Sequence, residues 1–241
     1  GEVDIQARNL AFNHYTFLHE NEKMGGFKTL LWRHAKGSHI ALFPNLNARD
    51  KEMRQLMRNA MFRRALSLAA DRAMINEILY FGLALESNNT VLPESSLYKE
   101  EYQYRWSEYD PDTARRFLDE IGLNKIDEDG FRLLPNGRPL EIIVETSGED
   151  TEQTDILELV KESWAKVGVK MFIKPSQRQV FRNRVFSGAA HMSVWGGIEN
   201  GVPTANSSPE EFVPTSQQHL MWPMWGQYFE TSGKAGEAPD L

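Results

Sequence analysis

The stretch FRRALSLAADRAMINEILYFG, residues 62–82, has the pattern of two short amphipathic helices joined by a turn. The apolar residues of the first helix recur at the spacing of one helical face: Phe62, Ala65, Leu66 and Ala69. Asp71 is placed to cap the second helix, and Gly82 is placed to end it. The apolar face of the second helix consists of Ile75, Ile78 and Leu79. The stretch carries no nucleophile, metal-ligand spacing or phosphate loop, so it predicts structural support rather than a reactive site.

Downstream of this stretch, helix and strand patterns alternate. Residues 109–122 predict a capped helix, and residues 127–146 contain Asp-Gly and Asn-Gly turns that predict a hairpin. The helical pattern of 151–168 and the strand pattern of 169–175 then complete a β-α-β unit with strand 140–145. The strands of such a unit are parallel. The prediction is therefore an α/β fold in which helices flank a mixed sheet.

The remaining segments divide by pattern. Helical patterns cover residues 15–26, 50–59 and 177–186, and strand patterns cover 27–34, 39–47, 191–197 and, weakly, 1–12. Residues 83–108 and 200–241 lack periodicity and predict loops.

Composition limits the possible partners. The chain has 241 residues, a formal net charge of −7 and no cysteine. An acidic chain without a basic stripe argues against nucleic acid as a partner, because phosphates are bound by basic surfaces. Disulfides and cysteine catalysis are excluded, and no run of about 18 apolar residues predicts a membrane span. No signal peptide pattern is present, and we expect the chain to be a piece of a longer protein.

A search for catalytic and cofactor motifs finds no dinucleotide-binding glycine pattern, no phosphate loop and no nucleophile elbow. The six histidines are scattered and no two are four residues apart, so neither a metal site nor a cofactor is predicted. His191 lies in a strand pattern and predicts a packed residue rather than a catalytic base. Arg72 predicts a structural ion pair with Asp71 or a cap on a backbone carbonyl.

Three carboxylates follow the strand pattern of 191–197. Glu199 together with Glu210 or Glu211 would suit a glycosidase, in which two carboxylates face each other across a cleft. The alternative is that all three are solvated surface acids, as expected in a chain of which 25% is charged. The sequence favours the second interpretation.

Three of the six tryptophans follow residue 190: Trp195, Trp222 and Trp225. Trp222 and Trp225 lie in polar, turn-rich sequence, where aromatic side chains often contact ligands. Trp195 ends the strand pattern MSVW, and ligands of open α/β sheets bind beyond the carboxyl ends of strands. The three tryptophans are therefore candidate ligand contacts, with packing as the alternative for each.

Five stretches occur in the order of one known family. They are NAMFRRALSLAADRAMINEILYFG (59–82), YDPDTARRFLDEIG (109–122), DGFRLLPNGRPLEIIVET (129–146), ILELVKESWAKVGVKMFIKP (156–175) and FSGAAHMSVWGG (186–197). Each resembles the corresponding motif of the family 5 extracellular solute-binding proteins, the dipeptide- and oligopeptide-binding components of bacterial ABC importers. The leading GEVDI is also similar to a segment of that family.

The resemblance implies a type II periplasmic-binding-protein fold, in which two lobes enclose a cleft. Residues 1–14 would be a segment coming from an N-terminal lobe that the chain lacks. Residues 15–225 would form the C-terminal ligand-binding lobe, and residues 226–241 a tail returning toward the missing lobe. The implied function is not enzymatic. It is capture of a peptide or similar small polar solute for a membrane permease, in the periplasm or on an extracellular lipoprotein.

The resemblance also implies candidate ligand contacts. The family's strand-end tryptophan falls on Trp195, and Glu199 and Asn200 stand where peptide binders often have an aspartate. The family's asparagine after an apolar strand falls on Asn45 or Asn47. Trp222 and Trp225 have no counterpart in the family pattern. Because aromatic rings stack on sugar faces, an oligosaccharide is an alternative ligand. A ligand-sensing domain of a regulator is an alternative setting for the same fold.

Overall fold

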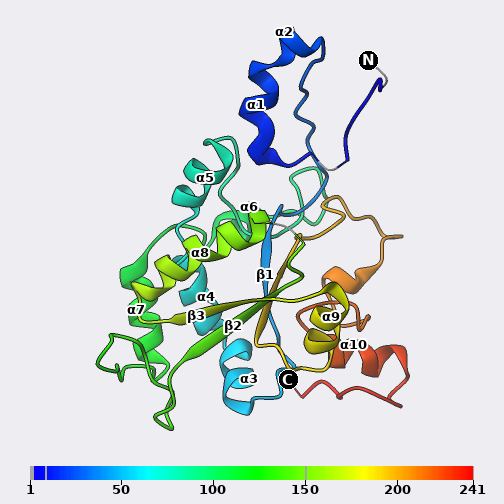
Figure 1. The fold of residues 1–241 in the computed structure, drawn as a ribbon. Helices are drawn as coiled ribbons and strands as arrows, with labels where there is room; N and C mark the ends of the chain where they lie inside the picture. The colour runs from blue at the N-terminus through cyan, green and yellow to red at the C-terminus, as the bar shows by residue number, and fades with distance from the viewer. Residues whose placement is uncertain (1–2, 9, 150, 241) are drawn as a thin grey trace.

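The computed structural model describes residues 3–8, 10–149 and 151–240. A four-stranded sheet lies at the centre, with helices on both of its faces (Figure 1). The strands are β1 (Ala41–Pro44), β2 (Glu141–Thr146), β3 (Lys170–Pro175) and β4 (Met192–Trp195). The predicted α/β fold, with a mixed sheet flanked by helices, is confirmed.

The strand order is β1-β4-β2-β3. Strand β2 pairs in parallel with both β3 and β4, whereas β1 pairs antiparallel with β4. Helix α8 (Thr151–Ala165) connects β2 to β3, which confirms the predicted β-α-β unit. The carboxyl ends of β2, β3 and β4 therefore lie along one edge of the sheet, and β1 begins at that same edge.

The main core lies between one face of the sheet and α3 (Lys51–Arg58), α4 (Ala60–Leu68), α5 (Arg72–Tyr80), α7 (Pro111–Glu120) and α8. The apolar stripe predicted for residues 151–168 is buried: Ile156, Val160, Trp164 and Val167. The Trp164 side chain donates a hydrogen bond from Nε1 to the backbone oxygen of Leu66 at 3.0 Å, which ties α8 to α4. Helix α5 packs through Ile75 and Leu79, whereas Ile78 is exposed, contrary to the predicted apolar face.

The opposite face of the sheet is covered by α9 (Arg178–Phe186), with α10 (Pro223–Glu230) beside it (Figure 1). Buried residues Phe181 and Val185 of α9 pack with Trp195 of β4. Because side chains alternate along a strand, Trp195 points away from the face on which Val194 joins the main core. Trp195 therefore lies between the sheet and α9.

Side-chain caps begin four of these helices, at Asp50, Asn59, Asp71 and Asp110. Each side chain accepts a hydrogen bond from a backbone N–H of the first turn, which would otherwise lack a partner. Arg72 donates to the backbone oxygens of Ser67 at 2.9 Å and Ser107 at 3.1 Å, which confirms its predicted role as a carbonyl cap.

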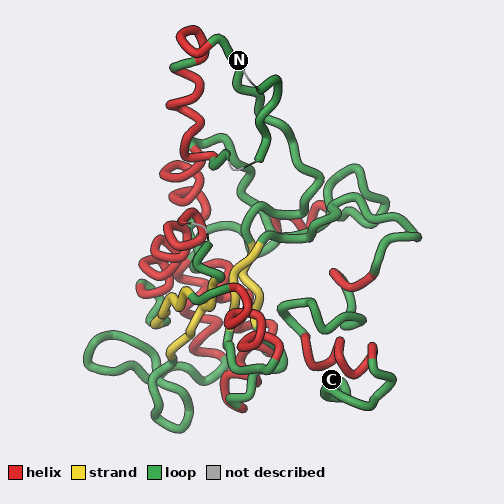
Figure 2. Tube along the Cα trace, turned by 45° about the vertical axis from the view of Figure 1, so that its right-hand side comes forward, coloured by secondary structure: helices red, strands yellow, loops and turns green. Residues whose placement is uncertain are grey.

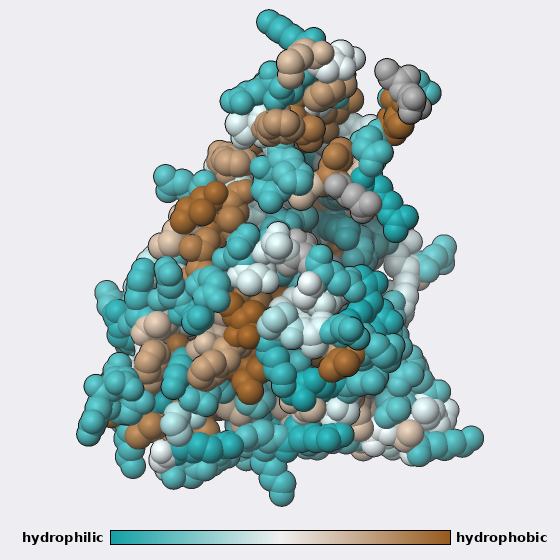
Figure 3. Space-filling view, in the orientation of Figure 1, coloured by the Kyte–Doolittle hydropathy of each residue, from teal (hydrophilic) through white to brown (hydrophobic). Residues whose placement is uncertain are grey.

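An arm, residues 12–34, projects from the body of the molecule (Figures 1 and 2). The predicted helix over 15–26 is divided into α1 (Tyr15–Glu20) and α2 (Glu22–Gly25), preceded by the short helix η1 (Phe12–His14). None of these elements contains a buried residue. The exposed apolar residues of the arm are Phe17, Met24, Phe27, Leu30, Leu31 and Trp32, and apolar side chains are visible on its surface (Figure 3).

Three strand predictions are wrong or only partly confirmed. Residues 27–34 form no strand, because no described segment supplies a paired neighbour. The hairpin over 127–146 is reduced to two isolated bridges, Ile126 with Arg132 and Leu133 with Pro139. Both sides of β2 are instead occupied by β3 and β4. Of the weak strand pattern over 1–12, Gly1, Glu2 and Asn9 lie outside the described residues and the rest forms no strand.

The segments predicted as loops contain three short helices: α6 (Glu100–Tyr104), η2 (Pro209–Glu211) and α10. No helix within the described part of the chain has the length and apolarity needed to cross a membrane.

Candidate functional site at the carboxyl edge of the sheet

The carboxyl edge of the sheet gathers several loops. Strand β4 ends at Trp195, which pairs with Ala41 at the start of β1. Beyond this pair, residues 35–38 and 197–201 continue side by side through hydrogen bonds such as Gly37 N to the Ile198 oxygen at 2.8 Å. Asn89 joins them by accepting a hydrogen bond from the backbone N–H of Ile198 at 2.9 Å. This edge is where an open α/β sheet is expected to bind ligands.

A shallow cavity of about 390 Å³ lies at the ends of β2 and β3. It is lined by Ser147, Gly148, Glu149, Pro175, Ser176, Gln177 and Arg178. The lining combines hydroxyl, amide and charged groups, so the cavity can form hydrogen bonds in several directions. The Ser176 hydroxyl is buried and has no hydrogen-bond partner in the described structure.

Trp195 is half-buried beside this cavity. Its ring stacks on Phe181 with the centroids 5.8 Å apart, and the Arg178 guanidinium lies 5.4 Å from its centroid. Arg178 also lines the cavity and pairs with Glu149, with Nε and Oε1 3.0 Å apart. The indole is thus held at the predicted edge, next to the cavity, and part of its surface remains accessible.

Glu199 and Asn200 are exposed in the loop after β4. The Glu199 carboxylate pairs with Lys36, whose Nζ lies 2.9 Å from Oε2. The Asn200 side chain accepts from the N–H of Val202 at 3.1 Å and donates to the Ser207 hydroxyl at 3.3 Å. Both predicted contacts therefore stand near the edge, each with an internal partner that a ligand would have to share or replace.

The carboxylates considered for a glycosidase lie in the same region. The backbone N–H of Glu199 donates to Glu211 Oε1 at 3.4 Å. Burial raises the pKa of Glu211; the hydrogen bond from Glu199 N lowers it, and the charges of Glu210 and Glu199 raise it. The Glu199 carboxylate itself is engaged with Lys36. Within the described residues, no group of three histidine, aspartate or glutamate side chains is arranged to hold a metal ion.

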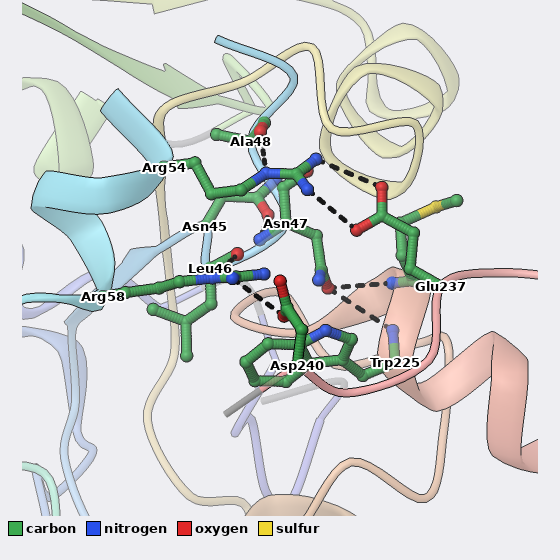
Figure 4. A network of polar contacts seen from close by, with 10 residues as sticks. Asn45, Leu46, Asn47, Ala48, Arg54, Arg58, Trp225, Glu237 and Asp240 are labelled. Carbon is green, nitrogen blue, oxygen red and sulfur yellow. Dashed lines mark hydrogen bonds and ion pairs between the residues drawn. The ribbon is translucent and has the colours of Figure 1, made fainter. Parts of the chain in front are cut away.

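Asn45 and Asn47 are not at this edge. Both are 1% exposed, in the loop that leaves β1 at the opposite end of the sheet. Asn45 donates to the backbone oxygen of Val185 at 3.0 Å, and the Asn47 Oδ1 atom accepts from the N–H of Met224 at 3.0 Å (Figure 4). Their side chains connect β1 to α9 and α10 through internal hydrogen bonds. Their role as ligand contacts stays a prediction.

Next to Asn45 and Asn47, two arginines of α3 form ion pairs with Glu237 and Asp240. Arg54 of α3 forms a two-pronged ion pair with Glu237, with N–O distances of 3.0 and 3.1 Å. Arg58, one helical turn later, pairs with Asp240 at 2.8 Å (Figure 4). Two residues of the predicted tail (226–241), Glu237 and Asp240, therefore lie against α3, and Leu241 falls outside the described residues.

Trp222 and Trp225 belong to the α10 region. Trp225 is 3% exposed, and the Arg58 guanidinium lies 4.9 Å from its ring centroid, so its faces are used in packing. Trp222 is half-buried and stacks on His219 with the centroids 4.2 Å apart. Neither ring lines the cavity at the carboxyl edge.

Charges at the carboxyl edge occur mainly as pairs. Besides Lys36 with Glu199 and Arg178 with Glu149, His39 contacts Glu152 at 3.1 Å. Burial alone would raise the pKa of Glu152, but hydrogen bonds from His39 and Tyr80 and the charge of His39 lower it overall. The pairs keep strong hydrogen-bond donors and acceptors close together at this edge.

Sequence reasoning did not single out the cavity residues. Arg178 and Glu149 lie 29 positions apart and look like ordinary surface charges. Their position in the sequence could have indicated the cavity. Residues 147–149 and 176–178 directly follow two predicted parallel strands, and the carboxyl ends of neighbouring parallel strands lie side by side at one edge of the sheet.

This geometry defines a class of protein. A mixed sheet flanked by helices is the architecture of a periplasmic-binding-protein lobe, and similar solved structures share this fold. The family model described as bacterial extracellular solute-binding proteins, family 5, middle region, matches residues 1–219. The chain belongs to this family, as its ordered motifs predicted.

Individual relatives are longer than this chain. The solved structure of the oligopeptide-binding protein OppA is 31% identical with a TM-score of 0.77, and the match covers 99% of this chain and 39% of that one. Heme-binding protein A of Haemophilus influenzae is 29% identical over 153 residues, 63% of this chain and 26% of that protein. The periplasmic alpha-galactoside-binding protein of Rhizobium meliloti is 25% identical over 129 residues, 52% of this chain and 19% of that protein.

Proposed function

We propose that this chain is the ligand-binding lobe of a bacterial ABC importer's solute-binding protein. It captures a peptide or similar small polar solute at the carboxyl edge of its sheet and presents it to a membrane permease. The proposed location is the periplasm or the outer face of the membrane. Family membership and the names of the relatives support this function.

The observation that carries the proposal is the position of Trp195. Trp195 is the last residue of the central strand β4. Its ring stacks on Phe181 of α9 and lies against Arg178, which lines the polar cavity. An aromatic surface beside paired charges and hydroxyl groups suits a solute with both apolar and hydrogen-bonding parts. Glu199 and Asn200, exposed in the loop that follows β4, are the proposed polar contacts with the solute.

The division of the chain is part of the proposal. We assign the compact body to one lobe and the arm to contacts with a second lobe, because α1 and α2 bury nothing in this chain. This extends the predicted incoming segment, residues 1–14, to about residue 34. Closure of two lobes around a solute would then shield the carboxyl edge from water.

Two solute classes fit the site, and relatives carry names from both. OppA is named for oligopeptides, whereas the Rhizobium meliloti relative is named for alpha-galactosides. We place peptides first, because OppA matches nearly the whole chain. The alternative of a glycosidase receives no support, because the Glu199 carboxylate is engaged with Lys36.

The test is Trp195→Ala in the intact protein, with pentaalanine and stachyose as probes in titration calorimetry. Loss of the ring is expected to weaken binding of the preferred probe by about 1–3 kcal/mol without unfolding the chain. Phe229→Ala is the matched control, because this exposed aromatic lies on α10, away from the carboxyl edge, and should leave affinity unchanged. Unchanged affinity in Trp195→Ala would remove Trp195 from the site.

A further inference from the structure

Glu145 of β2 is a carboxylate that the proposed site does not use. It is fully buried, and its Oε1 atom accepts a hydrogen bond from Arg184 Nε of α9 at 2.6 Å. Lys174 of β3 approaches the same oxygen at 4.0 Å from a more exposed position. A buried carboxylate is stable only when it is paired, so this contact needs a structural explanation.

Glu145 shares a face of the sheet with Trp195. It pairs in register with Ser193 of β4, and Trp195 stands two residues further along that strand. Because side chains alternate, Glu145, Ser193 and Trp195 all point toward α9. Arg184 reaches the carboxylate from the same helix that supplies Arg178 and Phe181 to the indole.

We propose that Glu145 is a positioning residue for Trp195, acting through Arg184. The ion pair is a charged, directional contact between the middle of the sheet and α9, whereas the apolar contacts of Phe181 and Val185 have no preferred direction. The other directional contact in this part of α9, from Asn45 to the Val185 oxygen, comes from the loop at the opposite end of the sheet. Phe181 and Arg178 lie within two turns of Arg184 on α9, so the anchor also fixes where they hold the indole. The consequence for solute binding rests on the function proposed above.

Two polar atoms beside the ion pair lack hydrogen-bond partners in the described structure. They are the Glu145 Oε2 atom and the Ser193 hydroxyl, and both are buried. The carboxylate therefore depends on Arg184 for its main charged contact, and the face contains no alternative cation as close. Removing the carboxylate charge should loosen α9 specifically, since the main core lies on the other face of the sheet.

The test compares Glu145→Gln with Glu141→Gln by NMR of the tryptophan indole N–H groups. Glu141 is the matched control: it lies on the same strand and pairs with Lys170 at 3.1 Å, but both partners are half-exposed and the pair does not include α9. The Trp195 signal is identified by its absence in Trp195→Phe. We expect the chemical shift of the Trp195 indole N–H to change in Glu145→Gln and to stay the same in Glu141→Gln. The chemical shifts of the other five tryptophans should change little in both variants.

A second variant tests the ion pair from its other side, in case Glu145→Gln does not fold. Arg184→Lys keeps the positive charge but removes the Nε donor, and it should move the same Trp195 signal. In the intact protein, Glu145→Gln should also weaken binding of the preferred probe by up to about tenfold, because a displaced Trp195 ring loses part of the contact that Trp195→Ala removes entirely. A Trp195 signal that stays in both variants overturns the inference. So does general unfolding, or movement of all six signals, because either result makes Glu145 a general core residue.

The two proposals fail differently. If the Trp195 signal moves and solute affinity stays the same, Glu145 positions the ring but the ring does not contact solute. If Trp195→Ala weakens binding and the Trp195 signal is insensitive to Glu145 and Arg184, the proposed function stands and the positioning role is wrong.

Discussion

His219 shows how burial sets the charge of a single side chain. It stacks on Trp222, meets Phe43 edge-on, and accepts a hydrogen bond from the N–H of Met221 at Nδ1, 3.2 Å away. Burial lowers its pKa to about 4, so the folded protein holds the ring neutral. Glu211 approaches the other ring nitrogen at 3.9 Å, a distance too long for a strong hydrogen bond.

Folding stability should fall as the pH drops from about 6.5 to about 4. In this window the unfolded chain binds a proton at His219 and the folded chain does not, which favours unfolding by up to about 3 kcal/mol. Urea unfolding at pH 7 and pH 4.5 should show a smaller loss in His219→Gln than in the wild type. His34→Gln, at an exposed position, serves as the control. Equal losses in all three proteins would refute the assignment.

Trp195 illustrates what sequence can say about one residue. A strand pattern followed by two glycines placed it at a sheet edge, and the structure has it there. The buried contacts of Asn45 and Asn47 could not be predicted in this way, because their partners lie 140 and 177 positions away along the chain. Trp225 looked like a loop aromatic because α10 has only eight residues, three of them buried, which leaves too short a periodic pattern to detect.

Helix α10 depends on a cap from a distant loop. Its own N-terminal neighbour, Trp222, provides no side-chain cap, and Asn47 instead accepts from the N–H groups of Met224 and Trp225 (Figure 4). Asn47→Ala should lower the free energy of unfolding by about 1–2 kcal/mol in urea, because those donors lose their acceptor.

Asn206→Ala is the control for this change, because Asn206 is exposed and a surface substitution typically alters stability by less than about 0.5 kcal/mol. The result that would revive Asn47 as a ligand contact is unchanged stability together with lost solute binding.

Elements with their own caps and periodicity were predictable. Helix α7 begins at its predicted cap, Asp110, and the predicted apolar stripes of α4 and α8 are buried. The missing strand over 27–34 and the reduction of the hairpin to two antiparallel bridges have a common reason. Strand pairing is decided by which partner is available, and β2 finds β3 and β4 through long-range contacts that local turn residues do not reveal.

At the scale of the whole molecule, stability is unevenly distributed. The body buries a continuous core, whereas α1 and α2 are six and four residues long and bury none of their side chains. Helices that short have little stability in water without packing partners.

Limited chymotrypsin digestion of the chain should therefore cut first between Phe17 and Trp32, where apolar residues are exposed on the arm. Mass spectrometry should then find a resistant fragment that begins near residue 33 and unfolds at nearly the temperature of the intact chain. First cuts within α4 or α8 would show instead that the arm is protected and the body is the less stable part.

The late position of β4 in the chain also bears on how the protein is made. This strand occupies the gap between β1 and β2, yet it is not synthesised until residues 192–195 leave the ribosome. Before then β1 has no neighbour and one side of β2 is open, so nascent chains present unpaired strands that can associate with one another. Efficient folding should accordingly depend on chaperones that hold the chain until β4 is available.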